Sequence, residues 1–140
     1  MHIVSVATEV SVVHRLYRAA GRSRLLHGHT WTVTVDIGTH CLSENGMVVE
    51  FAPIKTRIRE QLARHVDRHV LLARDDPAAA AVNTVAELLV FDGAPTAEAL
   101  AQHLFGIFMA VVAELMGERA KYLKVTVCEA YRLTASYDGL

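Results

Sequence analysis

The segment from His29 to Thr39 alternates apolar and polar side chains along its whole length. Its odd positions carry the apolar side chains of Trp31, Val33, Val35 and Ile37. A two-residue period is typical of a β-strand that buries one face and exposes the other. The segment from Ile3 to His14 is rich in Val, Ser and Thr and has the same period on its even positions. The two segments therefore predict strands of a sheet with one covered face.

Two longer segments have helical spacing instead. After Pro53, apolar residues recur at Ile54, Ile58, Leu62 and Val66, with charged residues between them. A second helix is expected after Thr96, which is a favourable N-cap residue, with Glu98 in the first turn. The apolar stripe of this second helix contains Leu100, Leu104, Phe108, Val111 and Leu115, and Gly117 is expected to end it. Asp75-Asp76-Pro77 is expected to interrupt any helix between these two.

Two short strands are expected near the C-terminal end. Residues 123–127 alternate apolar and polar side chains, and Leu133 to Tyr137 follows as a fourth strand. The order of elements is then strand, strand, helix, helix, strand, strand, or ββααββ. This order predicts one α+β domain over residues 1–140, in which an antiparallel four-stranded sheet is covered by two helices.

The charge and apolar patterns exclude several classes of partner. With 14 basic and 15 acidic residues the net charge is −1, so no basic field for nucleic acid is present. The most apolar stretch, Leu104 to Met116, is broken by Gly106 and Glu114 and is shorter than the ~20 residues of a membrane span. No export signal is recognisable at the N-terminus. Cys41 and Cys128 lie far apart, which favours a reduced, cytoplasmic compartment over a disulfide.

Three of the eight histidines fall close together in the sequence. In an extended segment, His27 and His29 point to the same face, and Gly28 between them leaves room for close approach. His14 ends the preceding strand, and an antiparallel partner would bring it alongside. Three imidazoles leave a zinc ion one open position, which is typical of catalytic zinc. The same spacing also fits ordinary histidines in a polar turn, so the residues alone leave both interpretations open.

Five motifs in sequence order resemble the 6-pyruvoyl-tetrahydropterin synthase family, which includes 6-carboxytetrahydropterin synthase. They are Val13-His14-Arg15-Leu16, Leu26-His27-Gly28-His29-Thr30, the segment from Glu44 to Phe51, Pro95-Thr96-Ala97-Glu98 and Val127-Cys128-Glu129. The resemblance implies the tunnelling fold (T-fold), with chains that assemble into barrel-like homo-oligomers, commonly hexamers, and with sites at subunit interfaces. It also implies a zinc site at His14, His27 and His29.

The resemblance further implies that Glu129 accepts paired hydrogen bonds from the aminopyrimidinone edge of a pterin. A carboxylate within an apolar strand is costly to bury without a partner, which agrees with a ligand-binding role. The alternative for Glu129 is a surface carboxylate paired with Lys124 or Arg132.

Two catalytic positions of the family differ in this chain. The family cysteine, four residues before the first histidine of the His-Gly-His motif, is replaced by Ser23, whose hydroxyl has a far higher pKa than a thiol. The Asp-His pair of the family aligns with Asp67 and Arg68, and His69 lies one position later. Arginine stays protonated at neutral pH and cannot act as a general base, but it can hold an anion or stabilise an oxyanion.

These departures predict a zinc-dependent lyase or cyclase with altered proton transfer, acting on a pterin-like or polyhydroxylated substrate of a biosynthetic pathway. Asp67 with His69 would move protons, while Arg68 and Ser23 would hold the substrate or an oxyanion. Standard synthase activity through His69 is one alternative, and a zinc-containing binding protein without turnover is another. At the level of single residues, an Asp67–Arg68 ion pair with His69 packed beside it is the simpler interpretation.

Three further features are weighed in the same way. Cys41 lies in a loop away from the His-Gly-His motif, and Cys128 is expected to be a buried thiol on the sheet face opposite Glu129. Neither is expected to replace the family cysteine. Four loop arginines either meet a phosphorylated substrate or are solvated, and these are Arg15, Arg18, Arg22 and Arg24.

Overall fold

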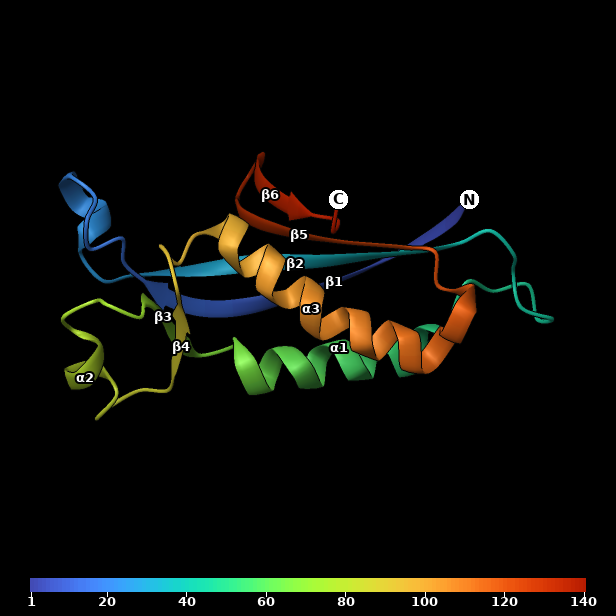
Figure 1. The fold of residues 1–140 in the computed structure, drawn as a ribbon, viewed down its shortest axis with the longest axis horizontal. Coiled ribbons are helices and arrows are strands. Elements are labelled where there is room, and N and C mark those ends of the chain that lie inside the picture. Colours follow the sequence, from blue (N-terminus) through green and yellow to red (C-terminus); the bar gives the residue numbers. More distant parts are fainter.

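The computed structural model describes residues 1–140 and contains one six-stranded sheet in the order β4-β3-β1-β2-β5-β6 (Figure 1). The strands are β1 (His2–His14), β2 (His27–Thr39), β3 (His69–Ala73), β4 (Leu88–Phe91), β5 (Tyr122–Ala130) and β6 (Leu133–Tyr137). The helices are α1 (Phe51–His65), α2 (Ala79–Val82) and α3 (Ala97–Met116). Short 3-10 turns lie at Gly21–Arg24 (η1) and Gly117–Arg119 (η2). The predicted α+β class is confirmed.

β1 and β2 form a long antiparallel hairpin that is the centre of the sheet. It pairs from His2 opposite Thr39 to His14 opposite His27 without a break. The odd positions of β2 from Trp31 to Ile37 are fully buried, while the even positions are only partly buried. The two-residue period in the sequence therefore identified the covered face, because alternate side chains of a strand point to opposite faces.

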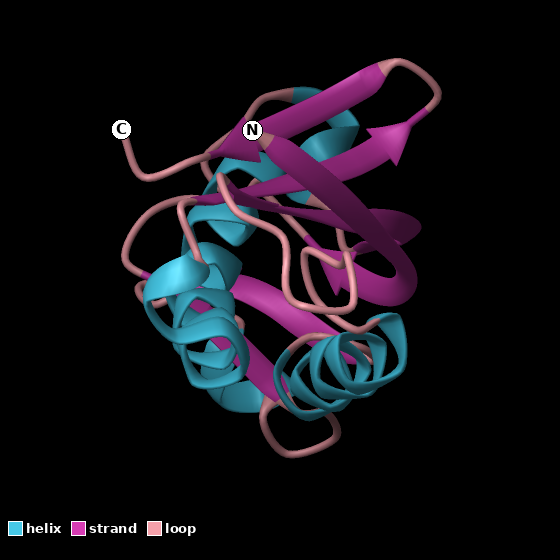
Figure 2. Cartoon of the chain, turned by 90° about the vertical axis from the view of Figure 1, so that its right-hand side faces the viewer, coloured by secondary structure: helices cyan, strands magenta, loops and turns pink.

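Helices α1 and α3 cover that face, and they lie side by side in Figures 1 and 2. The buried residues of α1 are Ile54, Ile58 and Leu62, as the spacing predicts. The side chain of Thr96 accepts a hydrogen bond from the backbone N–H of Ala99 at 3.2 Å, which confirms the predicted N-cap of α3. Gly117, with φ of 56°, ends α3 in the left-handed region, which glycine adopts at little cost.

Helix α3 with η2, from Ala97 to Arg119, is long and apolar enough to cross a membrane by length and composition alone. From the sequence we expected no membrane-spanning segment, because only the shorter stretch from Leu104 to Met116 was considered. In the fold, α3 instead buries a stripe that includes Leu100, Leu104 and Phe108 in the core formed with the sheet. An apolar core helix has the same composition as a membrane-spanning one.

The predicted four-stranded antiparallel sheet is incomplete. β6, β5, β2 and β1 are antiparallel as expected, but β3 and β4 extend the sheet in parallel orientation on the far side of β1. The sequence Val70-Leu71-Leu72 and the sequence Leu88-Leu89-Val90 are short apolar runs without alternation, and such runs do not distinguish a strand from a buried helix. This addition lies at the end of the hairpin where β1 joins β2, away from the N-terminus (Figure 1).

Candidate metal centre

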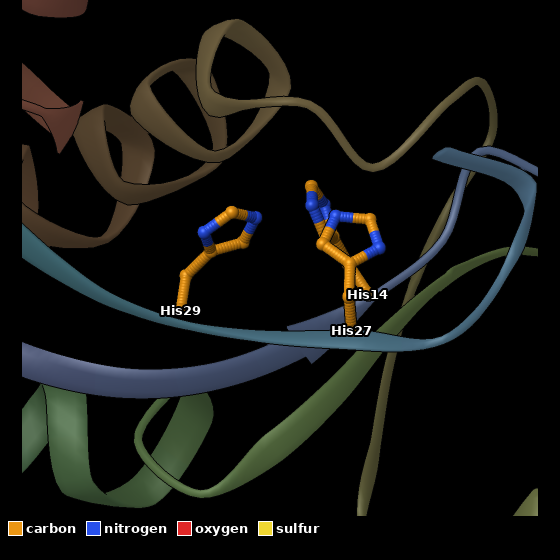
Figure 3. Close-up of side chains that lie close together, drawn as sticks. All are labelled: His14, His27 and His29. Atoms are coloured by element: carbon orange, nitrogen blue, oxygen red, sulfur yellow. The ribbon is translucent and has the colours of Figure 1, made fainter. Parts of the chain in front are cut away.

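The register of the β1–β2 hairpin brings the three predicted metal ligands together. His14 and His27 are directly opposite each other, and His29 follows two residues further along β2. Even positions of β1 and odd positions of β2 both face the helices, so the three imidazoles lie on one face of the sheet. Figure 3 shows all three side chains pointing away from the strands toward the segment that precedes α3.

The ring nitrogens converge and two of the rings are held in place by backbone carbonyls. One ligand atom from each histidine lies within 4.8 Å of the others. Nδ1 of His14 donates to the carbonyl oxygen of Pro95 at 2.8 Å, and Nδ1 of His27 donates to that of Leu25 at 2.7 Å. These hydrogen bonds fix the tautomer of each ring and present Nε2 to the centre of the cluster, as metal ligands require.

The third ring, His29, supplies the test of whether a metal fits. Its Nε2 atom is buried and has no hydrogen-bond partner within the chain, and such atoms are rare unless a ligand satisfies them. Burial lowers the pKa of His14 and also that of His29, so both favour the neutral form that binds metals. Three imidazoles on one face, with no fourth histidine or cysteine in the cluster, fit a zinc ion with an open position.

Trp31 forms the apolar floor of this cluster. Its ring is fully buried, with its centroid 5.0 Å from that of His14 and 5.4 Å from that of His29. A dry, rigid wall beside metal ligands limits solvent access and restricts ring motion. Because Trp31 is the single tryptophan of the chain, its fluorescence also reports on this site.

Glu129 lies beside the histidines. Its Oε1 is 3.5 Å from Nε2 of His29 and 3.9 Å from Nε2 of His14, and its side chain is about one-third exposed. The alternative pairing with Lys124 does not form, because Lys124 contacts Asp36 at 3.5 Å. A carboxylate with free acceptor capacity therefore stands at the edge of the metal cluster.

Cys128 precedes Glu129 and lies on the other face of the sheet, as expected. It is half-buried rather than buried, since that face has no helix over it, and its thiol donates to the carbonyl oxygen of Ala130 at 3.1 Å. Cys41 is exposed in the segment after β2. The two thiols are therefore both remote from the face that carries the histidines.

Ser23 lies in η1, within the loop that joins His14 to His27. Its side chain is exposed and makes no hydrogen bond, while its carbonyl oxygen accepts from the backbone N–H of Leu16 at 2.8 Å. The loop thus keeps Ser23 at the metal end of the hairpin, in a fixed backbone setting with a free hydroxyl.

Asp67 and Arg68 lie between α1 and β3, and His69 begins β3, the strand next to β1. Oδ1 of Asp67 accepts from the backbone N–H of Ser11 at 2.8 Å, and the backbone N–H of Arg68 donates to the carbonyl of Ser11 at 2.7 Å. His69 is buried, its Nδ1 donates to the carbonyl of Asp67 at 2.8 Å, and its Nε2 lies 3.3 Å from Glu87. Backbone contacts between β1 and the start of β3 therefore hold these residues as a group.

Arg68 itself is exposed and has a positive φ of 60°. A non-glycine residue in the left-handed region carries a conformational cost of about 1–2 kcal/mol. The alternative interpretation, an ion pair with Asp67, does not form, and the guanidinium makes no contact with an acidic side chain. The Arg68 guanidinium is thus exposed, and its N–H groups make no ion pair within the chain.

The loop arginines divide into two groups. Arg15 and Arg18 are engaged, because Arg15 pairs with the buried Asp76 and Arg18 pairs with Asp75 at 2.6 Å. Arg22 and Arg24 remain exposed without side-chain partners. The role of Asp76 was missed, since Asp-Asp-Pro in a sequence indicates only the interruption of a helix. No local pattern signals that one of two adjacent aspartates is buried against an arginine 61 residues away.

Comparison with known proteins decides the family. Residues 3–140 match the family described as 6-pyruvoyl tetrahydropterin synthase. The chain belongs to this family. The 6-carboxy-5,6,7,8-tetrahydropterin synthase of Aquifex aeolicus is 31% identical over 120 residues, covering 80% of this chain and 73% of the relative. That of Rickettsia conorii is 26% identical over 99 residues, covering 69% of this chain and 72% of the relative.

Solved structures confirm that the chain has the T-fold of this family. An uncharacterised protein from Wolinella succinogenes superposes with a TM-score of 0.77 at 17% identity and full coverage of both chains. The 6-pyruvoyl tetrahydropterin synthase of Plasmodium falciparum has a TM-score of 0.75 at 16% identity, covering 98% of this chain and 96% of its own. A Plasmodium vivax synthase, described with a catalytic glutamate replaced by alanine, has a TM-score of 0.74 at 16% identity and covers 99% of this chain and 98% of its own.

Proposed function

We propose that this member of the family is a zinc-dependent pterin-synthase-like lyase or cyclase with altered proton transfer. Its substrate is a pterin-like or polyhydroxylated compound of a biosynthetic pathway, other than the one the standard synthases use. One observation carries the proposal: His14, His27 and His29 converge beside Glu129. The resemblance to the family aligns Ser23 and Arg68 with its cysteine and histidine.

The metal and substrate groups have separate roles. When bound by the three histidines, zinc supplies a Lewis acid that polarises a hydroxyl or carbonyl oxygen of the substrate. Glu129 accepts hydrogen bonds from a planar donor edge such as an aminopyrimidinone or guanidine, because an ionised carboxylate offers two acceptor oxygens side by side. Since Glu129 stands 3.5 Å from His29, the recognised edge lies close to the metal ligands.

The proton-transfer group is Asp67 with His69. A neutral imidazole donates from one nitrogen and accepts at the other, and Nδ1 of His69 is already fixed as the donor to the backbone carbonyl oxygen of Asp67. Nε2 of His69 is therefore the atom that exchanges a proton, through Glu87 at 3.3 Å or directly with the substrate. Arg68 stays protonated and donates hydrogen bonds, and the Ser23 hydroxyl is far less acidic than the family thiol. We therefore assign these two side chains to holding the substrate or a developing oxyanion and not to proton transfer.

Carboxylate chemistry in the family supports this reassignment. The Plasmodium vivax synthase is described with a glutamate as a catalytic residue. A thiol is therefore not the sole catalytic group found within the fold, and the absence of the family cysteine is compatible with catalysis.

Assembly into a homo-oligomer, with a hexamer as the expected form, completes the proposal. Residues 2–10 of β1 have no strand partner on the side away from β2, and β6 is the other open edge of the antiparallel part of the sheet. Unpaired edges pair with strands of another chain when nothing covers them. Residues 1–140 would act as one T-fold unit in a cytoplasmic assembly.

The test compares the natural chain with a variant that restores the family residues. Zinc-loaded wild type and the variant Ser23→Cys/Arg68→His are assayed with dihydroneopterin triphosphate. We expect the variant to exceed the wild type by about a hundredfold or more, the usual contribution of a general acid–base pair. The control, Ser136→Cys/Arg64→His, changes the same residue types at exposed positions away from the site. Turnover by the wild type at the rate of the restored variant would instead indicate standard synthase activity.

The non-catalytic alternative makes a different prediction. A binding protein would hold pterins in a zinc-dependent way without converting them. Deletion of the gene would then leave pathway intermediates unchanged, whereas loss of an enzyme makes its substrate accumulate.

A further inference from the structure

Asp76 is the single acidic residue buried in the fold, and its side chain has no exposed surface. Both carboxylate oxygens are satisfied. Oδ2 accepts from Nε of Arg15 at 2.8 Å, and Oδ1 accepts from the second terminal nitrogen of Arg15 and from the backbone N–H of Ala78 at 2.8 Å. A buried charge is costly unless it is paired and hydrogen-bonded in this way, and the bidentate fork fixes the orientation of both groups.

The other end of this pair is at the metal hairpin. Arg15 follows the metal ligand His14 directly, and its remaining terminal nitrogen donates to the carbonyl oxygen of Arg24 at 3.4 Å. Beside it, the backbone N–H of Leu16 donates to the carbonyl of Ser23 at 2.8 Å. Arg15 thus joins the outgoing stem of the β1–β2 loop to its returning stem and ties both to Asp76.

Asp76 is in turn fixed by the end of the parallel part of the sheet. Its backbone N–H donates to the carbonyl of Ala73, the last residue of β3, at 3.0 Å. Its own carbonyl accepts from the N–H of Ala79, which begins α2, at 3.0 Å. Asp76 is therefore fixed between the end of β3 and the start of α2. The β1–β2 loop that its carboxylate holds contains only the short turn η1.

We propose that Asp76, acting through Arg15, is a positioning residue that holds the loop of Ser23 and the two strand ends carrying His14 and His27. This role rests on the metal centre of the proposed function, because the geometry that it maintains is that of the metal ligands. Partners that orient metal ligands typically change metal affinity by roughly ten- to hundredfold when removed.

A second ion pair of the same chain provides a matched control. Arg57 of α1 and Glu114 of α3 lie 2.7 Å apart in the helix layer, and the Glu114 side chain is 62% exposed. It joins an arginine to a carboxylate as the Arg15–Asp76 pair does, but it contacts neither the β1–β2 loop nor a metal ligand. Removal of the Arg57–Glu114 pair therefore shows how the loss of an ion pair changes zinc affinity when the β1–β2 loop is not affected.

The experiment measures zinc affinity by chelator competition in the full-length wild type, Asp76→Asn, Arg15→Lys and Glu114→Gln. We expect Asp76→Asn to weaken zinc binding at least tenfold, Arg15→Lys to weaken it less, and Glu114→Gln to leave it within twofold. Arg15→Lys keeps the charge but loses the fork, and it carries the test if Asp76→Asn does not fold. No substrate is present, so the result is independent of whether the proposed reaction is correct.

Limited trypsin digestion of the same proteins measures directly how accessible the β1–β2 loop is to cleavage. Arg18, Arg22 and Arg24 are exposed cleavage sites within it. Asp76→Asn should be cut at these sites at least severalfold faster than the wild type, while the remainder of the chain stays resistant. Unchanged zinc affinity, or cleavage spread over the whole chain with no preference for the loop, would overturn the positioning role.

Discussion

The two parts of the sheet contribute different things to the candidate site. The antiparallel part supplies the three histidines that could hold a metal, from β1 and β2, and Glu129 from β5. The parallel part supplies the groups around β3, namely Asp67, Arg68, His69 and the buried Asp76. The three histidines are brought together by strand register, whereas the β3 groups depend on loops and on contacts with β1. Within one chain, metal binding and proton transfer are therefore separable by mutation.

The largest expected effect is in the antiparallel part. His27→Ala should weaken zinc binding by about a thousandfold or more, because a zinc site loses most of its affinity when one of its three protein ligands is removed. Chelator competition measures the affinity, and cobalt quenching of Trp31 fluorescence provides a second readout. His40→Ala is the control, since His40 is exposed and outside the cluster. An equal loss in both variants would show that the effect is not ligation.

A change at Asp67, which lies in the parallel part and makes no contact with the β1–β2 loop, should spare the metal. Asp67→Ala removes the acceptor of the Ser11 N–H and should lower the free energy of unfolding by about 1–2 kcal/mol. Zinc affinity should stay within twofold of the wild type, while any turnover is lost. Denaturant unfolding and the zinc titration measure the two quantities. A zinc affinity that falls with the stability would show that the two parts are not separable.

The Arg15–Asp76 pair joins the two parts and predicts a pH effect. Hydrogen bonding from Arg15 holds the pKa of Asp76 below its usual range. The unfolded chain then binds a proton at higher pH than the folded one, so the pair stabilises the fold above about pH 4 and this stability is lost as the pH falls through the lower, folded-state pKa. Unfolding curves between pH 5 and pH 2 should show a steeper loss for the wild type than for Asp76→Asn. Parallel curves would contradict this assignment.

The smallest effect concerns the two non-glycine residues with positive φ, Arg68 and Arg132 at 60° and 62°. Replacement of either by glycine should raise the free energy of unfolding by no more than about 1 kcal/mol, because relief of strain is offset by the entropy of the unfolded glycine. Thermal unfolding should show similar small shifts for Arg68→Gly and Arg132→Gly. Substrate turnover should fall only for Arg68→Gly, and an equal fall in both would remove the assigned role of Arg68.

The same division explains what the sequence could predict. The covered face of β2, the cap at Thr96 and the alignment of His14 with His27 follow from short-range periods and from hairpin register. β3 and β4 are short apolar runs, and the pairing of β3 with β1 and of β4 with β3 depends on connections that no local pattern encodes. Asp76 is the same kind of case, since its burial depends on an arginine distant in sequence. The contact of Glu129 with His29 likewise required the neighbouring strands of the folded sheet.

The central claim is that His14, His27 and His29 together bind one zinc ion with an open position. X-ray absorption at the zinc edge of the zinc-loaded protein tests it most directly, because it reports the ligand atoms and their distances. The structure predicts three imidazole ligands at about 2.0–2.1 Å and one further oxygen, with no sulfur. A spectrum with a sulfur ligand at about 2.3 Å, or with fewer than three imidazoles, would contradict it.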